Sequence, residues 1–258
     1  MDKTLTAIVL IIGNEILSGR TQDTNTPWIA TKLADRGIKL VGVRVIPDLE
    51  DVIISTLNEL RHKVTYIFTT GGIGPTHDDI TSETMAKAFK VAYVLNPEAR
   101  AILLNYYGTE DQLTPARLKM AHMPEGAKLI HNPVSGAPGF QIGNVYVMAG
   151  VPRIMQAMLD GILPELETGN PILSNSVTCD LPESKIAESL ENIQKNYQTV
   201  DIGSYPHFRV GDMGLSLVLR STDNDNLHRA TRDVVEMVRS FGREPLSISA
   251  RTQGIAIV

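Results

Sequence analysis

The sequence predicts an α/β protein: a three-layer α/β/α domain with a mostly parallel sheet, followed by a small α+β domain. In the first part of the chain, short apolar runs alternate with helical patterns. This order is expected when helices cover both faces of a parallel sheet. After the stretch 167–171, which contains Gly169 and Pro171, the order changes to β-α-β-β-α. We therefore expect one domain at residues 1–170 and a second at 171–258.

The strands of the first domain are predicted from apolar runs of strand length that end at glycine or polar residues. They are expected at residues 5–12, 38–46, 64–70, 128–131 and 145–149. Helix starts are predicted from capping side chains and from prolines suited to the first turn. These starts are expected at Thr26, Asp48, Ser82, Asn96, Thr114 and Pro152.

The second domain is expected to place its helices on one side of a small sheet. Strands are predicted at residues 174–179, 200–205 and 215–219, with a helix at 182–197. A long helix follows, capped by Asp223 or Asp225 and ending at Phe241. The apolar residues 254–258 are expected to add an edge strand.

Composition excludes several classes of protein. A hydrophobic fraction of 43% in 258 residues can build a core, and the net charge of −5 lacks the basic excess of a general nucleic-acid binder. The single cysteine, Cys179, excludes an internal disulfide framework and is typical of a reducing compartment. No signal-peptide pattern and no apolar run of membrane-spanning length is present. We expect a cytoplasmic protein without a membrane partner.

Three acidic residues follow three successive predicted strands: Glu15, Asp48 and Asp79. Ligands of doubly wound sheets bind at the carboxyl ends of the strands, so these candidate catalytic acids should converge on one edge. Simpler interpretations stay open: Glu15 as a solvated loop acid, and Asp48 as a helix cap. Asp79 could equally cap the next helix, together with its neighbour Asp78.

A glycine turn between the third strand and the next helix is the strongest candidate for ligand binding. Gly71, Gly72 and Gly74 let the backbone approach a ligand and direct N–H groups at a phosphate, with Thr76 beside them. Asp78 and Asp79 in the same segment can hold a divalent metal against that anion. The alternative is a tight connection without a ligand.

Two further segments are predicted to contact the ligand. The small-residue loop 132–140 contributes Ser135, Gly136 and Gly139; its alternative is a plain hairpin connection. Gly150 follows a predicted strand and precedes a helix, which repeats the geometry of an anion site.

These motifs together resemble a known family. Residues 12–19 and 23–25, the glycine segment 70–81, the loop 132–139 and the turn 150–152 are similar to the N-terminal domain of the CinA competence/damage-inducible proteins. The wider superfamily includes the MogA, MoaB and MoeA molybdopterin-binding domains and one half of eukaryotic FAD synthases. The close resemblance covers residues 4–165, and residues 171–258 are similar to the KH-like domain that follows in CinA.

The resemblance implies a MogA-like fold and functional acids at Glu15, Asp48 and Asp79. It also implies a metal-dependent pyrophosphatase acting on ADP-ribose or FAD, a divalent cation (Mg²⁺, Mn²⁺ or Co²⁺) with K⁺ as a further candidate, and a homo-oligomer, either a dimer or a trimer. The sequence ends where full-length CinA proteins continue into a nicotinamide-nucleotide amidase domain, so no amidase activity is inferred.

Two other functions remain open. A molybdopterin-binding protein of molybdenum-cofactor biosynthesis would use the same pocket, although Ile73 and the pair 148–149 depart from the usual motifs of those enzymes. A non-catalytic nucleotide-binding module is the third hypothesis. Binding of RNA by the KH-like part is not expected, because the loop 206–211 lacks a Gly-x-x-Gly clamp.

Overall fold

The computed structural model describes residues 4–209 and 212–251. With the exception of the turn Asp35–Gly37, the chain divides between Gly169 and Asn170 into two compact units. The first unit has two hydrophobic cores and the second unit has one. Among the described residues, no helix combines the length and the apolar character that crossing a bilayer requires.

A six-stranded sheet with the order β2-β1-β3-β8-β7-β6 organises the first unit. Its parallel strands are β1 (Leu5–Ile12), β2 (Ile38–Ile46), β3 (Tyr66–Thr70) and β8 (Val145–Met148). Two antiparallel strands extend the sheet: β7 (Gly139–Ile142) and β6 (Lys128–Ile130). The prediction of a mostly parallel sheet is confirmed.

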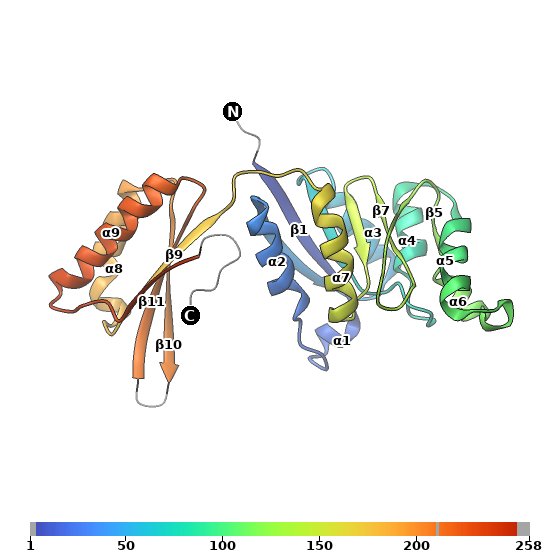
Figure 1. Ribbon diagram of the computed structural model, residues 1–258, viewed down its shortest axis with the longest axis horizontal. Helices are drawn as coiled ribbons and strands as arrows, with labels where there is room; N and C mark the ends of the chain where they lie inside the picture. The colour runs from blue at the N-terminus through green and yellow to red at the C-terminus, as the bar shows by residue number, and fades with distance from the viewer. Residues whose placement is uncertain (1–3, 210–211, 252–258) are drawn as a thin grey trace. The chain divides into compact units, whose positions relative to one another are not determined.

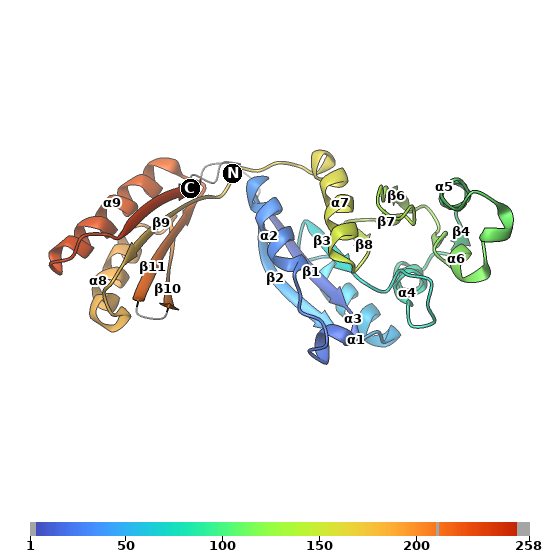
Figure 2. The ribbon, with the colours of Figure 1, turned by 60° about the horizontal axis from the view of Figure 1, so that its bottom comes forward.

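Helices cover both faces of this sheet, which makes the unit three-layered (Figures 1 and 2). One face is covered by α2 (Asn25–Asp35) and α7 (Pro152–Ile162). The other is covered by α3 (Glu50–Leu60), α4 (Thr81–Phe89) and α5 (Pro97–Tyr107). Alternate residues of β1 therefore enter two different cores, Leu10 on one side and Val9 on the other. Burial on both faces explains why β1 is a continuous apolar run.

The helix α2 begins at Asn25, before the predicted N-cap Thr26 and two residues before the predicted first helical residue, Pro27. Asp23 Oδ1 accepts hydrogen bonds from the backbone N–H groups of Asn25, at 2.9 Å, and Thr26, at 3.1 Å. Asp23 therefore supplies the cap that we assigned to Thr26. The sequence signal was ambiguous because three capping residue types, at positions 23, 24 and 25, precede Thr26.

Further element boundaries also differ from the predictions. The helix α3 starts at Glu50 and its N-cap is Leu49, so the interpretation of Asp48 as the start and cap of this helix is wrong. The strand β3 begins at Tyr66 and not at Val64. The short elements α1 (Asn14–Leu17) and η2 (Leu163–Glu165) complete this part of the chain.

An inserted segment between α4 and β6 groups at one end of the first unit (Figure 2). It consists of β4 (Tyr93–Leu95), α5, η1 (Glu110–Gln112), α6 (Pro115–Lys119) and β5 (His122–Pro124). Asn96 and Thr114 cap α5 and α6 with their side chains, as predicted. The paired strands β4 and β5 were missed because three residues are too few to show a periodic pattern.

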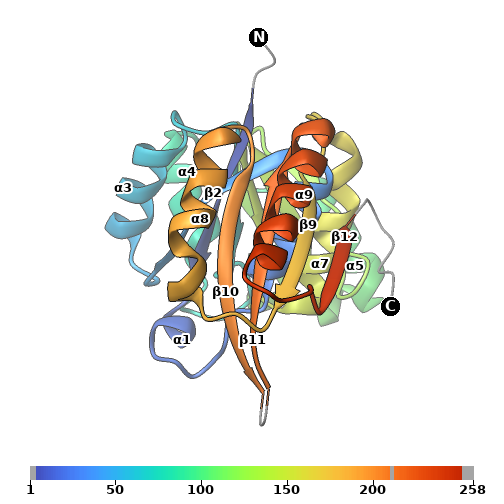
Figure 3. The same ribbon diagram turned by 90° about the vertical axis from the view of Figure 1, so that its left-hand side faces the viewer.

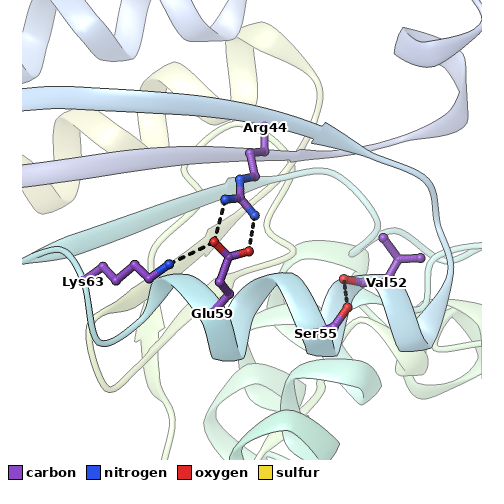
Figure 4. Close-up of polar contacts among 5 residues, drawn as sticks. All are labelled: Arg44, Val52, Ser55, Glu59 and Lys63. Carbon is purple, nitrogen blue, oxygen red and sulfur yellow. Dashed lines mark hydrogen bonds and ion pairs between the residues drawn. The ribbon is translucent and has the colours of Figure 1, made fainter.

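The edge strand β2 is tied to α3 by a charged cluster (Figure 4). Both terminal nitrogens of Arg44 donate to the Glu59 carboxylate, at 2.6 and 2.8 Å, and Lys63 Nζ donates to it at 3.0 Å. The hydrogen bond from Arg44, and then that from Lys63, lowers the pKa of Glu59 to about 2.

The second unit is an antiparallel sheet with the order β10-β11-β9-β12. Its strands are β9 (Leu173–Cys179), β10 (Asp201–Arg209), β11 (Asp212–Ser221) and β12 (Ser247–Arg251). The helices α8 (Glu183–Asn196) and α9 (Asn224–Ser240) lie on the same side of this sheet (Figure 3). Asp223 caps α9. The strand β12 was not predicted, and the strand expected at 254–258 lies outside the described residues.

Candidate functional site

The predicted ligand-binding segments all lie at one edge of the six-stranded sheet. Because β1, β2, β3 and β8 are parallel, their carboxyl ends share this edge. The chain passes from β2, on one side of β1, to β3 on the other, so the topological switch point lies between β1 and β3. Ligands of open α/β sheets bind at this kind of position.

The glycine turn after β3 packs too closely for any other residue. Gly71 and Gly72 have φ values of 101° and 68°, a region that side chains disfavour. A Cβ at Gly71 would overlap the carbonyl oxygen of Ile12, and one at Gly72 would overlap Thr81 Oγ1. The backbone of this turn is therefore held directly against the end of β1 and the start of α4.

Glu15 and Asp48 follow the ends of β1 and β2, respectively. Asp48 Oδ2 accepts a hydrogen bond from the backbone N–H of Asn14 at 2.9 Å. Its Oδ1 lies 3.6 Å from the position that a Cβ on Gly72 would take, so Asp48 reaches the glycine turn as well. The Glu15 carboxylate folds back over Gly13, where it would overlap any Cβ. Of the three predicted acids, Asp48 thus borders the turn, while the Glu15 carboxylate lies over Gly13 after β1.

The third acid, Asp79, is engaged within its own loop. Its Oδ2 accepts hydrogen bonds from the backbone N–H of Thr76, at 2.8 Å, and from Thr76 Oγ1, at 2.5 Å. Thr76 Oγ1 also lies 2.6 Å from Asp78 Oδ1, and this bond is the main cause of a lowered pKa of Asp78. The helix α4 has Ile80 as its N-cap and no side-chain cap, so the interpretation of Asp79 as a helix cap is wrong.

Some helix N-termini at this edge have no side-chain cap. The helices α4 and α7, which follow β3 and β8, have no side-chain cap, whereas α5 and α6 are capped by Asn96 and Thr114. Uncapped N–H groups at a helix start carry a partial positive charge that favours an anion. The start of α2 is not available for this purpose, because the Asp23 carboxylate already accepts from it.

The loop 132–139 connects the antiparallel strands β6 and β7, so it is a hairpin connection, and it lies at the same edge. The Asn132 side chain, 2% exposed, orders it by donating to Ser135 Oγ at 2.7 Å and accepting from the N–H of Val134 at 3.0 Å. Gly139 is the first residue of β7, and a Cβ there would overlap the carbonyl oxygen of Val147. Ser135 and Gly139 therefore have structural roles in the loop.

Three residues at the site were missed from the sequence. The Asn25 side chain is 7% exposed and donates from Nδ2 to the carbonyl oxygen of Gly150 at 2.8 Å, while its Oδ1 is buried without a partner among the described residues. Thr81 Oγ1, under Gly72, is likewise buried and unpartnered within the described chain. Lys119 Nζ donates to the carbonyl oxygen of Thr76. Asn25 and Thr81 lie within recognisable motifs, but Lys119 is 43 residues from its partner and carries no sequence signal.

A cation at this site would need ligands from the substrate as well as from the protein. Among the residues that the structure describes, no three His, Cys, Asp or Glu side chains cluster closely enough to hold a metal ion by themselves. The site offers three carboxylates as cation ligands. Two of them, Asp78 and Asp79, accept hydrogen bonds from the same Thr76 hydroxyl, and the third, Asp48, lies at the glycine turn. Mg²⁺ commonly binds to one or two carboxylates together with substrate phosphates, so this donor set fits a shared cation.

The fold is that of an α/β protein with a candidate ligand site at the carboxyl edge of a mostly parallel sheet. Residues 8–168 match the family described as a probable molybdopterin binding domain, and residues 171–242 match the family described as the middle domain of FAD synthase. Together with the CinA relatives described below, these matches show that the chain belongs to the CinA-type family.

Relatives cover most of the chain. A protein of Metallosphaera sedula is 32% identical over 252 residues, which are 93% of this chain and 95% of that protein. A CinA-like protein of Desulfosudis oleivorans is 36% identical over 196 residues, 71% of this chain but 48% of its own length. The crystal structure of CinA from Thermoplasma acidophilum, a protein of unknown function, is similar with a TM-score of 0.59 and 35% identity, and covers 63% of this chain and 99% of its own.

Proposed function

We propose that this chain is a divalent-metal-dependent nucleotide pyrophosphatase that hydrolyses ADP-ribose or a related dinucleotide such as FAD. The observation that carries the proposal is the meeting, at one switch point, of the glycine turn 71–72, an uncapped helix start and the Asp48 carboxylate. Anion-binding N–H groups and a cation-binding acid at the same place suit a metal–diphosphate ligand. The match to the FAD synthase middle domain supports a nucleotide substrate.

Each predicted residue has a role in this proposal. The backbone of Gly71, Gly72, Gly74 and Gly150 approaches the diphosphate, while Thr76, Ser135, Gly136 and Gly139 shape the loops that enclose it. Glu15 orients the attacking water at the end of β1. The water oxygen bonds to one phosphorus as the bridging oxygen leaves with the other, so ADP-ribose gives AMP and ribose 5-phosphate.

Asp79, Asp48 and Asp78 are the residues that would hold the cation, which we take to be Mg²⁺, Mn²⁺ or Co²⁺, with K⁺ as a further candidate. When bound, a divalent cation supplies charge that polarises a phosphoryl oxygen. The contribution of the chain itself is to hold Asp78 and Asp79 together through Thr76 and to place Asp48 against the turn.

The test is a hydrolysis assay of the purified full chain with each divalent ion against ADP-ribose, FAD, NAD and dinucleoside polyphosphates. We expect turnover of at least one diphosphate, lost on chelation and restored by added metal. No turnover of any of these substrates with any of the ions would contradict the proposal. The proposal also places the protein in the cytoplasm as a homo-oligomer, a dimer or trimer, and a sedimentation mass of one chain at micromolar concentration would contradict that assembly.

A second function is molybdopterin binding, favoured by the match of residues 8–168 to the probable molybdopterin binding domain. The same glycine turn would then receive the pterin phosphate, and no hydrolysis would occur. Equilibrium binding of molybdopterin, measured beside ADP-ribose, separates the two. Tight binding of nucleotides with no turnover would instead identify a non-catalytic nucleotide-binding module.

A further inference from the structure

One exposed aromatic ring lies against the loop 132–139. Tyr106, near the end of α5, is 52% exposed. Its ring packs on Gly136, where a Cβ would lie 2.6 Å from Tyr106 Cγ and 2.8 Å from Cδ2. Gly136 has a φ of 75°, so both its conformation and the contact exclude a side chain there. The inserted segment therefore brings an aromatic surface onto one of the predicted ligand loops.

Tyr107, the next residue, packs against the core and is not a candidate for ligand stacking. The guanidinium of Arg117 lies 4.0 Å from the centroid of the Tyr107 ring, and Tyr107 packs against the core. Tyr106 meets Tyr107 edge to face, with ring centroids 5.1 Å apart. Tyr107 is thus a packed residue, whereas half of the surface of Tyr106 faces solvent.

The position of Tyr106 relative to the glycine turn has a chemical consequence. The loop 132–139 and the turn 71–72 lie at the same edge, and β6 is three strands from β3 in the sheet. At the usual strand spacing β6 lies about 14 Å from β3, and β7, where the loop ends, lies about 10 Å from it. A diphosphate alone cannot span that distance, but a diphosphate joined through a sugar to a planar ring can.

We propose that Tyr106 is a stacking platform for the planar ring of the nucleotide whose diphosphate binds at Gly71 and Gly72. This subsite rests on the proposed function, since it takes the adenine ring that ADP-ribose and FAD have in common. Aromatic side chains stack on bases with little sequence preference, because every base has a π-face. Lys119, in the same inserted segment, donates to the Thr76 carbonyl, so this segment also contacts the loop that holds Asp79.

The experiment measures equilibrium binding of AMP and of inorganic pyrophosphate to the full chain by calorimetry in the presence of Mg²⁺. The variants are Tyr106→Ala, Tyr106→Leu, which keeps apolar cover over Gly136, and Tyr106→Phe, which keeps the ring. Tyr205→Ala is the matched control, because Tyr205 is 49% exposed and lies in the second unit.

We expect Tyr106→Ala and Tyr106→Leu to weaken AMP binding about tenfold or more, as stacking predicts, and to change pyrophosphate binding by less than about twofold. Tyr106→Phe and the Tyr205 control should keep AMP affinity within about threefold. Equal losses for both ligands would assign Tyr106 to loop support and overturn the proposal, as would unchanged AMP binding or a wild type that does not bind AMP. AMP binding that depends on the Tyr106 ring, without turnover of ADP-ribose or FAD, would contradict the pyrophosphatase activity but support this subsite.

Discussion

Replacing Asp79 by Asn separates a cation-binding role from a loop-ordering role. The Asp79 carboxylate accepts two hydrogen bonds from Thr76 and lies beside Asp78, which is held on the same hydroxyl. Asn has the same size and keeps one acceptor oxygen, but it removes the charge. If Asp79 holds the cation, the chemistry should suffer more than the fold.

The structure sets the size of the effect on stability. Hydrogen bonds to charged groups contribute about 1.5–3 kcal/mol and neutral ones about 1, so the change at this half-buried side chain should cost about 1 kcal/mol or less. Relief of repulsion with Asp78 offsets part of that loss. The melting temperature should therefore fall by no more than about 2–4 °C. A loop-ordering role alone would then lower turnover by at most about fivefold, since 1.4 kcal/mol is a factor of ten.

A cation-binding role predicts a much larger loss of activity. Turnover of ADP-ribose should fall about a hundredfold or more, which corresponds to about 2.7 kcal/mol of transition-state stabilisation. Turnover and melting temperature are measured on the same preparation, with Asp111→Asn as a charge-matched control at an exposed residue of η1. A fivefold or smaller loss for Asp79→Asn would refute the metal role, and the carboxylate would then be a loop residue held by Thr76.

Three other changes test the site and the fold. Gly72→Ala should lower the free energy of unfolding in urea by about 2 kcal/mol or more. The control Gly19→Ala has a similar φ of 71° but no atom within 4 Å of the added Cβ, so it should lower that free energy by about 1 kcal/mol. Equal losses would contradict the overlap of a Cβ on Gly72 with Thr81. Asn25→Ala should cost about 0.5–1.5 kcal/mol, since it removes the hydrogen bond from this buried side chain to the Gly150 carbonyl, and a loss within error in the same measurement would contradict that contact. The pKa of Glu59 is about 2 in the folded protein, and its ordinary value is 4.5. The ionised carboxylate therefore stabilises the fold above pH 4.5, and this stabilisation is lost as the pH falls toward 2. Glu59→Gln should flatten the fall of the urea midpoint over that pH range, and an unchanged slope would argue against the bond to Arg44.

Much of the first unit follows from local patterns. The strands β1 and β2 match their predicted bounds. The run of β1 is buried along its length and ends before Gly13, whereas β2 has exposed residues between its buried ends and stops before Pro47, so run length and the residues that follow set both bounds. The caps Asn96 and Thr114 were predicted because each precedes a proline at the first helical position. The misplaced start of α2 arose where several capping residues stand in a row, and only the hydrogen bonds of Asp23 decide among them.

The sequence by itself determined that glycine turns and acids follow the strands of a parallel sheet, so it determined which edge of the sheet carries the site. Side-chain partners were decided only by the tertiary structure. Asp48 accepts a hydrogen bond from the N–H of Asn14, 34 positions earlier in the chain. Tyr106 packs on Gly136, 30 positions later. Such contacts depend on how separate elements pack, and no local periodicity or turn motif encodes them. The bonds of Asp79 to Thr76 are local, three residues apart, but the neighbouring residues alone fit a cap, a cation ligand or a loop contact equally well, and only the folded loop decides among them.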